Sequence, residues 1–273
     1  MRRGARGFTL IELVLALMLS ALLGVVVVRI LLTTSRFYAG DSARRNARVV
    51  ARSPLGLLRA ELRNIEPGGG LIAADSQSLT VRSGYATGLV CTAGSGQITV
   101  SLMPADSLPL ASASFAGVAW RGESGAWTYA DGGTITAGGS ASCGGAGIAA
   151  GGAAVVITTT VPAFPQSGSP VFLYQRVTYR FAASSALPGR LALWRLTGTS
   201  GGDELAAPFG SGARFRFHTA SAESSLTAAP SPLSAMRGIE LVLDGASEKP
   251  PRATGTPAAT GLTTSVFFRN RSL

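Results

Sequence analysis

A 25-residue stretch near the N-terminus restricts most strongly what this chain can become. Between Phe8 and Leu32 only Glu12 and Arg29 carry a charge. At about 1.5 Å of rise per residue, a helix of this length spans the roughly 30 Å hydrocarbon core of a bilayer. The sequence therefore predicts a single membrane-spanning helix over this stretch.

The leader that precedes this helix differs from an ordinary secretory signal. It is short, carries three arginines and ends in Gly7, directly before the apolar stretch. An ordinary signal peptide is cleaved after its apolar region at a small-x-small site, and no convincing site of that kind follows Leu32. The leader therefore does not fit an ordinary cleaved signal, and an uncleaved signal anchor is the alternative.

Glu12 is the second unusual feature of the apolar stretch. A carboxylate in lipid costs a few kcal/mol and usually implies a partner or a function. An acid in the first helical turn also interacts favourably with the helix dipole, but that effect contributes only about 0.3–1 kcal/mol. If the chain were cut between Gly7 and Phe8, a new amino group would lie one helical turn from Glu12. We therefore expect a functional role for this carboxylate.

The string GFTLIE at residues 7–12 resembles the start of the prepilin family, which comprises type IV pilins, type II secretion pseudopilins and competence pseudopilins. The resemblance covers residues 1–34. It implies that a membrane-embedded prepilin peptidase cuts between Gly7 and Phe8 and methylates the new N-terminal Phe8. It also implies that Glu12 pairs with the N-terminal amine of a neighbouring subunit, so that two charges removed from water compensate each other.

The same resemblance implies a location and a set of partners. The chain would cross a bacterial inner membrane once, with its leader in the cytoplasm and its C-terminal domain outside the cytoplasm, and would enter a pilus or pseudopilus after assembly. Its partners would be other pilin or pseudopilin subunits, the prepilin peptidase/methyltransferase and an inner-membrane assembly platform. The residues themselves indicate no cofactor and no bound metal.

The residues that follow predict an α+β fold. Behind the leader (residues 1–7) and the transmembrane helix (residues 8–34), an apolar stripe among arginines predicts an amphipathic helix over residues 35–66. Gly40 and Pro54 should bend or break this helix. From residue 67 to residue 273, short β-like segments alternate with turn residues, which predicts a β-rich, pilin-like periplasmic domain.

The expected strands are 78–82, 87–91, 97–102, 117–121, 126–130, 155–161, 171–181, 191–196, 214–218, 239–243 and 263–268. The segments 131–152 and 245–261 consist mainly of small and turn-forming residues and predict surface loops. The chain length, the VTYRF strand at 177–181 and the VFFRNR ending at 266–271 resemble the J-type minor pseudopilins of type II secretion and the PilW-like minor pilins. This second resemblance implies a minor subunit at or near a filament tip, because extra bulk is awkward in a repeating shaft.

The two cysteines, Cys91 and Cys143, both follow the apolar stretch. If this region lies outside the cytoplasm, they are a candidate disulfide that closes a loop of about 50 residues and stabilises the fold by roughly 3–4 kcal/mol. Two unrelated buried thiols are the alternative. Their spacing gives no metal signature, since no second cysteine or histidine lies near either.

The net charge of +10 raises the question of an anionic partner such as nucleic acid or lipid headgroups. Seven arginines between residues 34 and 64 face only Asp41 and Glu61, which favours a solvated helix face beside anionic lipid over a DNA site. Alternating arginines and aromatics at 214–218 and 176–180 could stack on single-stranded DNA. Their period of two instead favours amphipathic strands with the aromatic rings in the core.

No catalytic pattern emerges from the sequence. His218 is the only histidine, and Asp75 and the acids at 203–204 are isolated carboxylates, most simply solvated loop residues. The segment 145–150 loosely matches a dinucleotide-binding fingerprint but is followed by a β-like segment rather than a helix. We therefore expect a non-enzymatic subunit. Two other functions stay open: a competence pseudopilin that contacts DNA, and a membrane-tethered periplasmic binding protein that does not polymerise.

Overall fold

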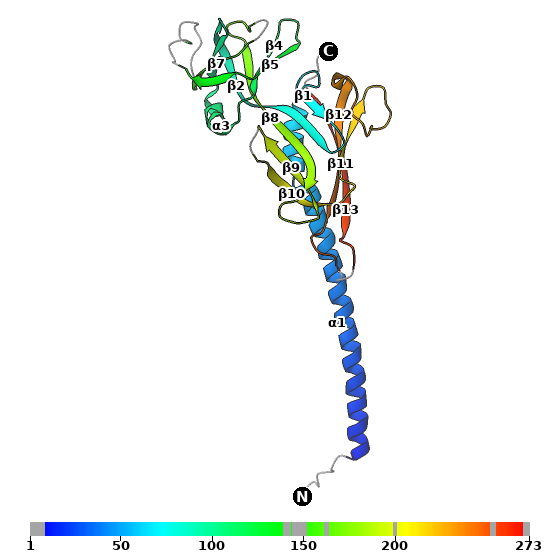
Figure 1. The fold of residues 1–273 in the computed structure, drawn as a ribbon. Helices are drawn as coiled ribbons and strands as arrows, with labels where there is room; N and C mark the ends of the chain where they lie inside the picture. Colours follow the sequence, from blue (N-terminus) through cyan, green and yellow to red (C-terminus); the bar gives the residue numbers. More distant parts are fainter. Residues whose placement is uncertain are drawn as a thin grey trace.

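The computed structural model describes residues 9–138, 143, 152–160, 164–198, 201–251 and 255–269. Its first element, α1, is a helix of 43 residues, Leu10–Arg52. The N-terminal part of α1 projects far beyond a β-rich body (Figure 1). We call residues 10–42 the stalk and the rest of the described chain the head. A long apolar helix followed by a large antiparallel sheet confirms the predicted α+β class.

The helix breaks at the proline but not at the glycine. α1 runs through Gly40 without interruption and ends at Arg52, and a second helix, α2, begins after Pro54 and covers Leu55–Arg63. Glycine costs a helix only about 1 kcal/mol and keeps its N–H, whereas proline removes a hydrogen-bond donor and clashes with the preceding turn. The predicted break at Pro54 is therefore confirmed, and the one at Gly40 is wrong.

All described strands belong to one antiparallel sheet. Its main path runs β11-β12-β10-β9-β8-β2-β3-β7-β6, while β1 joins β2, β13 joins β12, and β4 joins both β8 and β5. The strands are β1 Leu71–Ala74, β2 Ser78–Gly94, β3 Gln97–Leu102, β4 Gly117–Arg121, β5 Trp127–Asp131, β6 Thr134–Ala137, β7 Ala154–Thr158, β8 Pro170–Ala183, β9 Leu191–Thr197, β10 Asp203–Phe209, β11 Arg214–Thr219, β12 Met236–Ala246 and β13 Ala259–Phe267. A short helix, α3 (Ser107–Ser112), and two 3-10 turns, Pro104–Asp106 and Leu233–Ala235, complete the described elements.

The head has two lobes, which share the long strands β2 and β8 (Figure 1). The lobe beside the two long helices, α1 and α2, which we call the lobe beside the helices, has a core built from α2, β9, β11, β12 and the first half of β2. The other lobe has its own core from β3, β4, β7 and the second half of β2. Between the two halves of β2, Gly84 pairs with Tyr174 and Ala86 with Leu173, so Tyr85 is the extra residue of a β-bulge.

Small residues dock α1 on the head. Ala43, Ala47 and Ala51 are buried and lie four residues apart, so they share one helix face. This face contacts β10, β12 and β13. A Cβ atom added to Gly245 of β12 would lie 2.2 Å from the backbone oxygen of Ala47. The helix and the strand therefore approach each other so closely that only glycine fits at this position.

We expect Gly245→Val to lower the free energy of unfolding of the head by about 1–3 kcal/mol, because overpacking must push β12 away from α1. Urea titration of the detergent-solubilised chain, followed by tryptophan fluorescence, measures the change. Gly261→Val on the neighbouring strand is the matched control, since a Cβ there meets nothing within 4 Å. An equal response of both variants would contradict the tight contact.

The predicted strand bounds are confirmed where apolar and polar residues alternate regularly. The strands expected at 97–102 and 117–121 coincide with β3 and β4. The two strands expected at 78–82 and 87–91 are instead one continuous strand, β2, because the bulge at Tyr85 lets the pairing continue. The strands β1, β6 and β10 were not expected from the sequence. β6 lies in the expected loop 131–152, most of which falls outside the described residues together with the fingerprint-like segment 145–150.

Candidate functional site

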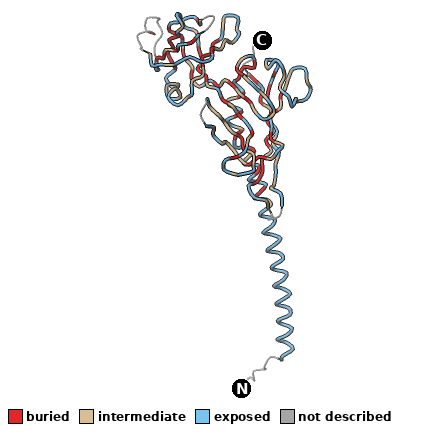
Figure 2. Tube along the Cα trace, in the orientation of Figure 1, coloured by how far each residue is buried: buried red, intermediate tan, exposed pale blue. Residues whose placement is uncertain are grey.

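The stalk exposes a continuous apolar surface. Large side chains from Leu10, which is 83% exposed, to Leu32 lie open on all sides of the helix, and Figure 2 shows this part of the chain as exposed throughout. The helix has a mean hydropathy of 2.7 over its most apolar window and is, by length and composition, the one described helix able to cross a membrane. Soluble monomers rarely expose such a surface. The stalk therefore requires lipid or other apolar helices around it.

A capping box begins this helix. The Thr9 backbone N–H and hydroxyl both donate to the Glu12 carboxylate at 2.9 Å, and the Glu12 N–H donates to Thr9 Oγ1 at 3.4 Å. The carboxylate is thereby held at the N-terminal end of α1 rather than along its flank. Gly7 and Phe8 lie outside the described residues. The T-x-x-E spacing could have identified Thr9 as the cap, a role that the sequence reasoning missed.

The seven arginines between residues 34 and 64 lie at different heights: the first is in the stalk, the next four follow on α1, and the last two are on α2. All seven are exposed, and Arg45 pairs with Asp41 at 2.6 Å. If Leu32 ends the membrane segment, Arg36 stands about 6 Å beyond it and Arg52 about 30 Å beyond it, at 1.5 Å of rise per residue. Only the first of these arginines would then reach lipid headgroups. The surface expected to face anionic lipid is therefore limited to the arginine nearest the membrane.

A buried ion pair fixes α2 against the sheet. Glu61 accepts hydrogen bonds from Arg195 of β9, at 2.9 Å, and from the hydroxyl of Tyr179 on β8. The side chains of Arg195 and Glu61 are 18% and 15% exposed. Burial, reinforced by the neighbouring Glu61 carboxylate, raises the pKa of Tyr179, so the hydroxyl remains a donor. Removing either charge would leave the other buried and unpaired, a cost of several kcal/mol.

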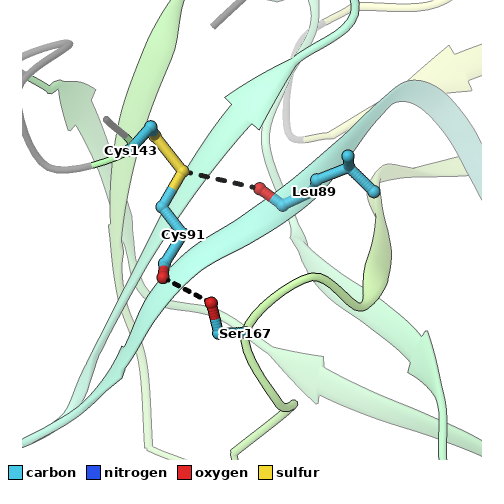
Figure 3. The surroundings of a disulfide bond; sticks show 4 residues. All are labelled: Leu89, Cys91, Cys143 and Ser167. Carbon is cyan, nitrogen blue, oxygen red and sulfur yellow. Dashed lines mark hydrogen bonds between the residues drawn. A yellow bond between two sulfur atoms is a disulfide. The ribbon is translucent and has the colours of Figure 1, made fainter. Parts of the chain in front are cut away.

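A disulfide joins the two cysteines in the lobe away from the helices. The Cys91 and Cys143 Cα atoms lie 4.7 Å apart, and both residues are buried (Figure 3). Cys91 is the extra residue of a second bulge in β2, because Val90 pairs with Val100 and Thr92 with Thr99. Its carbonyl accepts a hydrogen bond from the Ser167 hydroxyl at 2.8 Å. The bridge therefore ties the segment that contains Cys143 to the central strand.

The aromatic rings of the alternating segments 176–180 and 214–218 are inaccessible to nucleic acid. Phe215, Phe217 and Tyr179 are fully buried in the core beside the helices. Arg176 and Arg180 are exposed on the opposite face of β8. The predicted amphipathic strands are therefore confirmed, and these rings cannot stack on nucleic acid.

The acidic residues and the histidine serve local structure. His218 lies in β11, with Nε2 2.9 Å from the Ser265 hydroxyl. Glu204, expected in a solvated loop beside Asp203, instead belongs to β10 and accepts hydrogen bonds from Ser184 and Ser185. Asp75 accepts the N–H groups of Gln77 and Ser78 and so closes the turn between β1 and β2. Within the described ranges, no group of three or more His, Cys, Asp or Glu side chains could hold a metal ion.

Comparison with known proteins supports the interpretation of the N-terminus. Residues 2–28 match the family model of the prokaryotic N-terminal methylation motif, the motif of type IV prepilin-like proteins. The match includes Gly7, Phe8 and Glu12 and extends well into the stalk. No curated protein and no solved structure matches the chain. The motif and the membrane-capable helix are thus established, while the head must be interpreted from its own structure.

Proposed function

We propose that this chain is a non-enzymatic minor pilin or pseudopilin subunit. In this proposal prepilin peptidase cuts between Gly7 and Phe8 and methylates Phe8. The helix of residues 8–34 anchors the chain in a bacterial inner membrane, with the head in the periplasm. The observation that carries the proposal is the methylation motif at residues 2–28, which overlaps a helix whose apolar side chains are exposed.

The division of α1 supports a role in assembly. Its last ten residues are held on the head by small residues, whereas residues 10–39 are exposed throughout. The stalk can therefore leave lipid and enter a bundle of equivalent helices without unfolding the head. In such a bundle Glu12 would meet the methylated amine of a neighbouring subunit, and the apolar side chains would remain buried throughout the transfer.

The size of the head supports a position at or near the tip. The lobe that contains β4, β5 and β7 lies away from the axis of α1, on the side opposite β11, β12 and β13 (Figure 1). A repeating shaft would have to accommodate this overhang at every subunit, whereas a tip has no subunit above it. We therefore place the chain with the J-type minor pseudopilins or PilW-like minor pilins, in a type II secretion pseudopilus or a type IV pilus.

Intact mass measurement of the membrane-extracted chain tests the proposal. In cells with prepilin peptidase, we expect loss of residues 1–7 and a methylated N-terminal Phe8. In cells without the peptidase, the leader should remain. A chain that keeps its leader in peptidase-competent cells would instead be a signal-anchored, non-polymerising protein.

Deletion of the gene identifies the machine that the subunit serves. Loss of surface pili with normal secretion would assign the subunit to a type IV pilus. Retained pili with secretory proteins trapped in the periplasm would assign it to type II secretion. Normal pili and normal secretion with lost DNA uptake would assign it to a competence pseudopilus.

A further inference from the structure

A cleft of about 590 Å³ opens where the two lobes meet the end of α2. This volume lies within the range of small-molecule binding sites. Its lining comes from α2 and the turn after it, from the bulged part of β2, and from β4, β5 and β8. The cleft lies well away from the stalk and is not used by the proposed assembly.

One wall of the cleft is aromatic. Strand pairing places Phe172 beside Ala119 and Ala119 beside Tyr129, so the two rings share a face of the sheet. The Trp127 ring lies 5.3 Å from Phe172 and 6.2 Å from Tyr129, and Tyr129 lies 6.1 Å from Tyr174. These four rings form a continuous surface whose faces carry negative electrostatic potential.

The charged groups of the cleft leave an excess of carboxylates. Glu61 is paired with Arg195, and Arg82 is paired with Asp131. Glu66 and Asp106 also line the cleft, and neither forms an ion pair with any described residue. Glu66 is only 5% exposed. A buried carboxylate without a cation is costly, so the cleft disfavours anions and favours a positive ligand.

The Glu66 carboxylate keeps unused acceptor capacity. Its Oε1 accepts the Gly68 N–H at 2.6 Å, and its Oε2 accepts a long hydrogen bond of 3.4 Å from the Tyr129 hydroxyl. An ionised carboxylate offers about four acceptor positions. The group therefore has room for one or two further donors.

Tyr85 supplies a second unsatisfied group. It is the bulged residue of β2, and bulges commonly redirect a side chain near a binding site. Its hydroxyl oxygen is buried and has no hydrogen-bond partner among the described residues. Burial raises the pKa of Tyr85 to about 12, so the hydroxyl stays neutral at physiological pH. A buried polar group without a partner is destabilising, and a ligand that hydrogen-bonds to it removes this cost.

The protein already places one cation on this aromatic surface. The Arg82 guanidinium carbon lies 4.9 Å from the Tyr129 ring centre and 5.6 Å from that of Tyr174. Burial alone would raise the pKa of Asp131, but hydrogen bonds from Arg82, Tyr174 and Arg176 lower it to about 2, so the carboxylate that holds Arg82 remains charged. Arg82 covers Tyr129 and Tyr174 but not Trp127, which is partly exposed.

We propose that this cleft binds an organic cation, an ammonium or guanidinium group on an apolar stem, between the Trp127 ring and the carboxylates of Glu66 and Asp106. The cation could belong to a basic side chain of a peptide or to a free quaternary amine. Either source satisfies the same chemistry: attraction to the ring face, neutralisation of the carboxylates and burial of the stem. This inference goes beyond the proposed function, because it gives the head a ligand independent of filament assembly.

Neutral isosteres test the proposal directly. Isothermal titration of the full-length chain in non-ionic detergent compares Nα-acetyl-arginine amide with its citrulline counterpart, and choline with 3,3-dimethylbutan-1-ol. We expect at least one cation to bind about tenfold or more tightly than its neutral isostere. A preference for the arginine compound indicates a peptide ligand, and a preference for choline indicates a free amine. Equal binding within each pair, or no binding by either cation, would overturn the proposal.

Variants locate the binding. Glu66→Gln keeps an acceptor for Gly68 but removes the charge, and we expect it to weaken cation binding about tenfold. Trp127→Ala should weaken binding similarly, and Trp127→Phe should restore part of it. Glu223→Gln changes the same charge at an exposed position outside the cleft and serves as the control. Equal affinity of the Glu66→Gln and control variants, both with unaltered melting temperatures, would refute this location.

Discussion

Replacing Glu12 with alanine is expected to leave the leader cleaved but to reduce incorporation into filaments by about tenfold or more. In the proposed assembly the Glu12 carboxylate neutralises the amine of a neighbouring Phe8, and alanine leaves that amine unpaired in an apolar bundle. The measurement is the ratio of the chain in sheared filaments to the chain in the membrane. Intact mass of the membrane fraction reports the cleavage.

The capping box requires a control that separates charge from helix capping. Glutamine at position 12 can still accept the Thr9 N–H, so Glu12→Gln preserves the cap but removes the charge. Charge pairing predicts that Glu12→Gln fails as badly as Glu12→Ala. Normal incorporation of the glutamine variant alone would assign the effect to capping, and normal incorporation of both would contradict the pairing with Phe8.

The N-terminus could be predicted from the sequence because its constraints are local. A 25-residue apolar stretch has few structural solutions, and the GFTLIE string carries its own specificity. The break at Pro54 also follows from one residue, which lacks an N–H. The error at Gly40 has a physical origin: glycine weakens a helix by far less than proline does, because it keeps its backbone N–H.

The contact between α1 and the head could not be predicted from the apolar stripe. Val49 is a large apolar residue of the segment 35–66, yet its side chain is 65% exposed, whereas the buried positions of α1 are Ala43, Ala47 and Ala51. Alanine gives a weak hydropathy signal, so close backbone packing is difficult to recognise from one element alone. The information lies in the pairing of this alanine row with Gly245, about 200 residues away in the chain.

The cleft likewise depends on long-range pairing. Trp127 and Phe172 belong to strands that could be expected separately, but only the register of β4 against β5 and β8 brings their rings together. The bulge at Tyr85 does not interrupt the strand. Instead, the alternation of buried side chains shifts by one residue within β2, and the sequence does not mark this shift. The strand β10 has no period-two pattern and forms because β9 and β12 offer it hydrogen-bond partners.

Removing the disulfide is expected to have the largest effect on the stability of the head. The cross-link joins residues 52 positions apart, and a closed loop of this length restricts the unfolded chain by about 3–4 kcal/mol. We expect the double variant Cys91→Ala/Cys143→Ala to lower the free energy of unfolding by this amount. The loop includes β3, β4 and β5, which build the core of the lobe away from the helices, so that lobe should lose most protection against amide hydrogen exchange.

The effect of the bridge can be separated from the effect of the substituted side chains. Reductant should destabilise the unmodified chain as much as the double substitution does, and should leave the double variant unchanged. The lobe beside α2 should keep its slow amide exchange in every case, because its core contains neither cysteine. Two free thiols in the denatured, unreduced chain would refute the cross-link itself. Equal loss of protection in both lobes would instead show that β2 and β8, which run through both cores, make the head one cooperative unit.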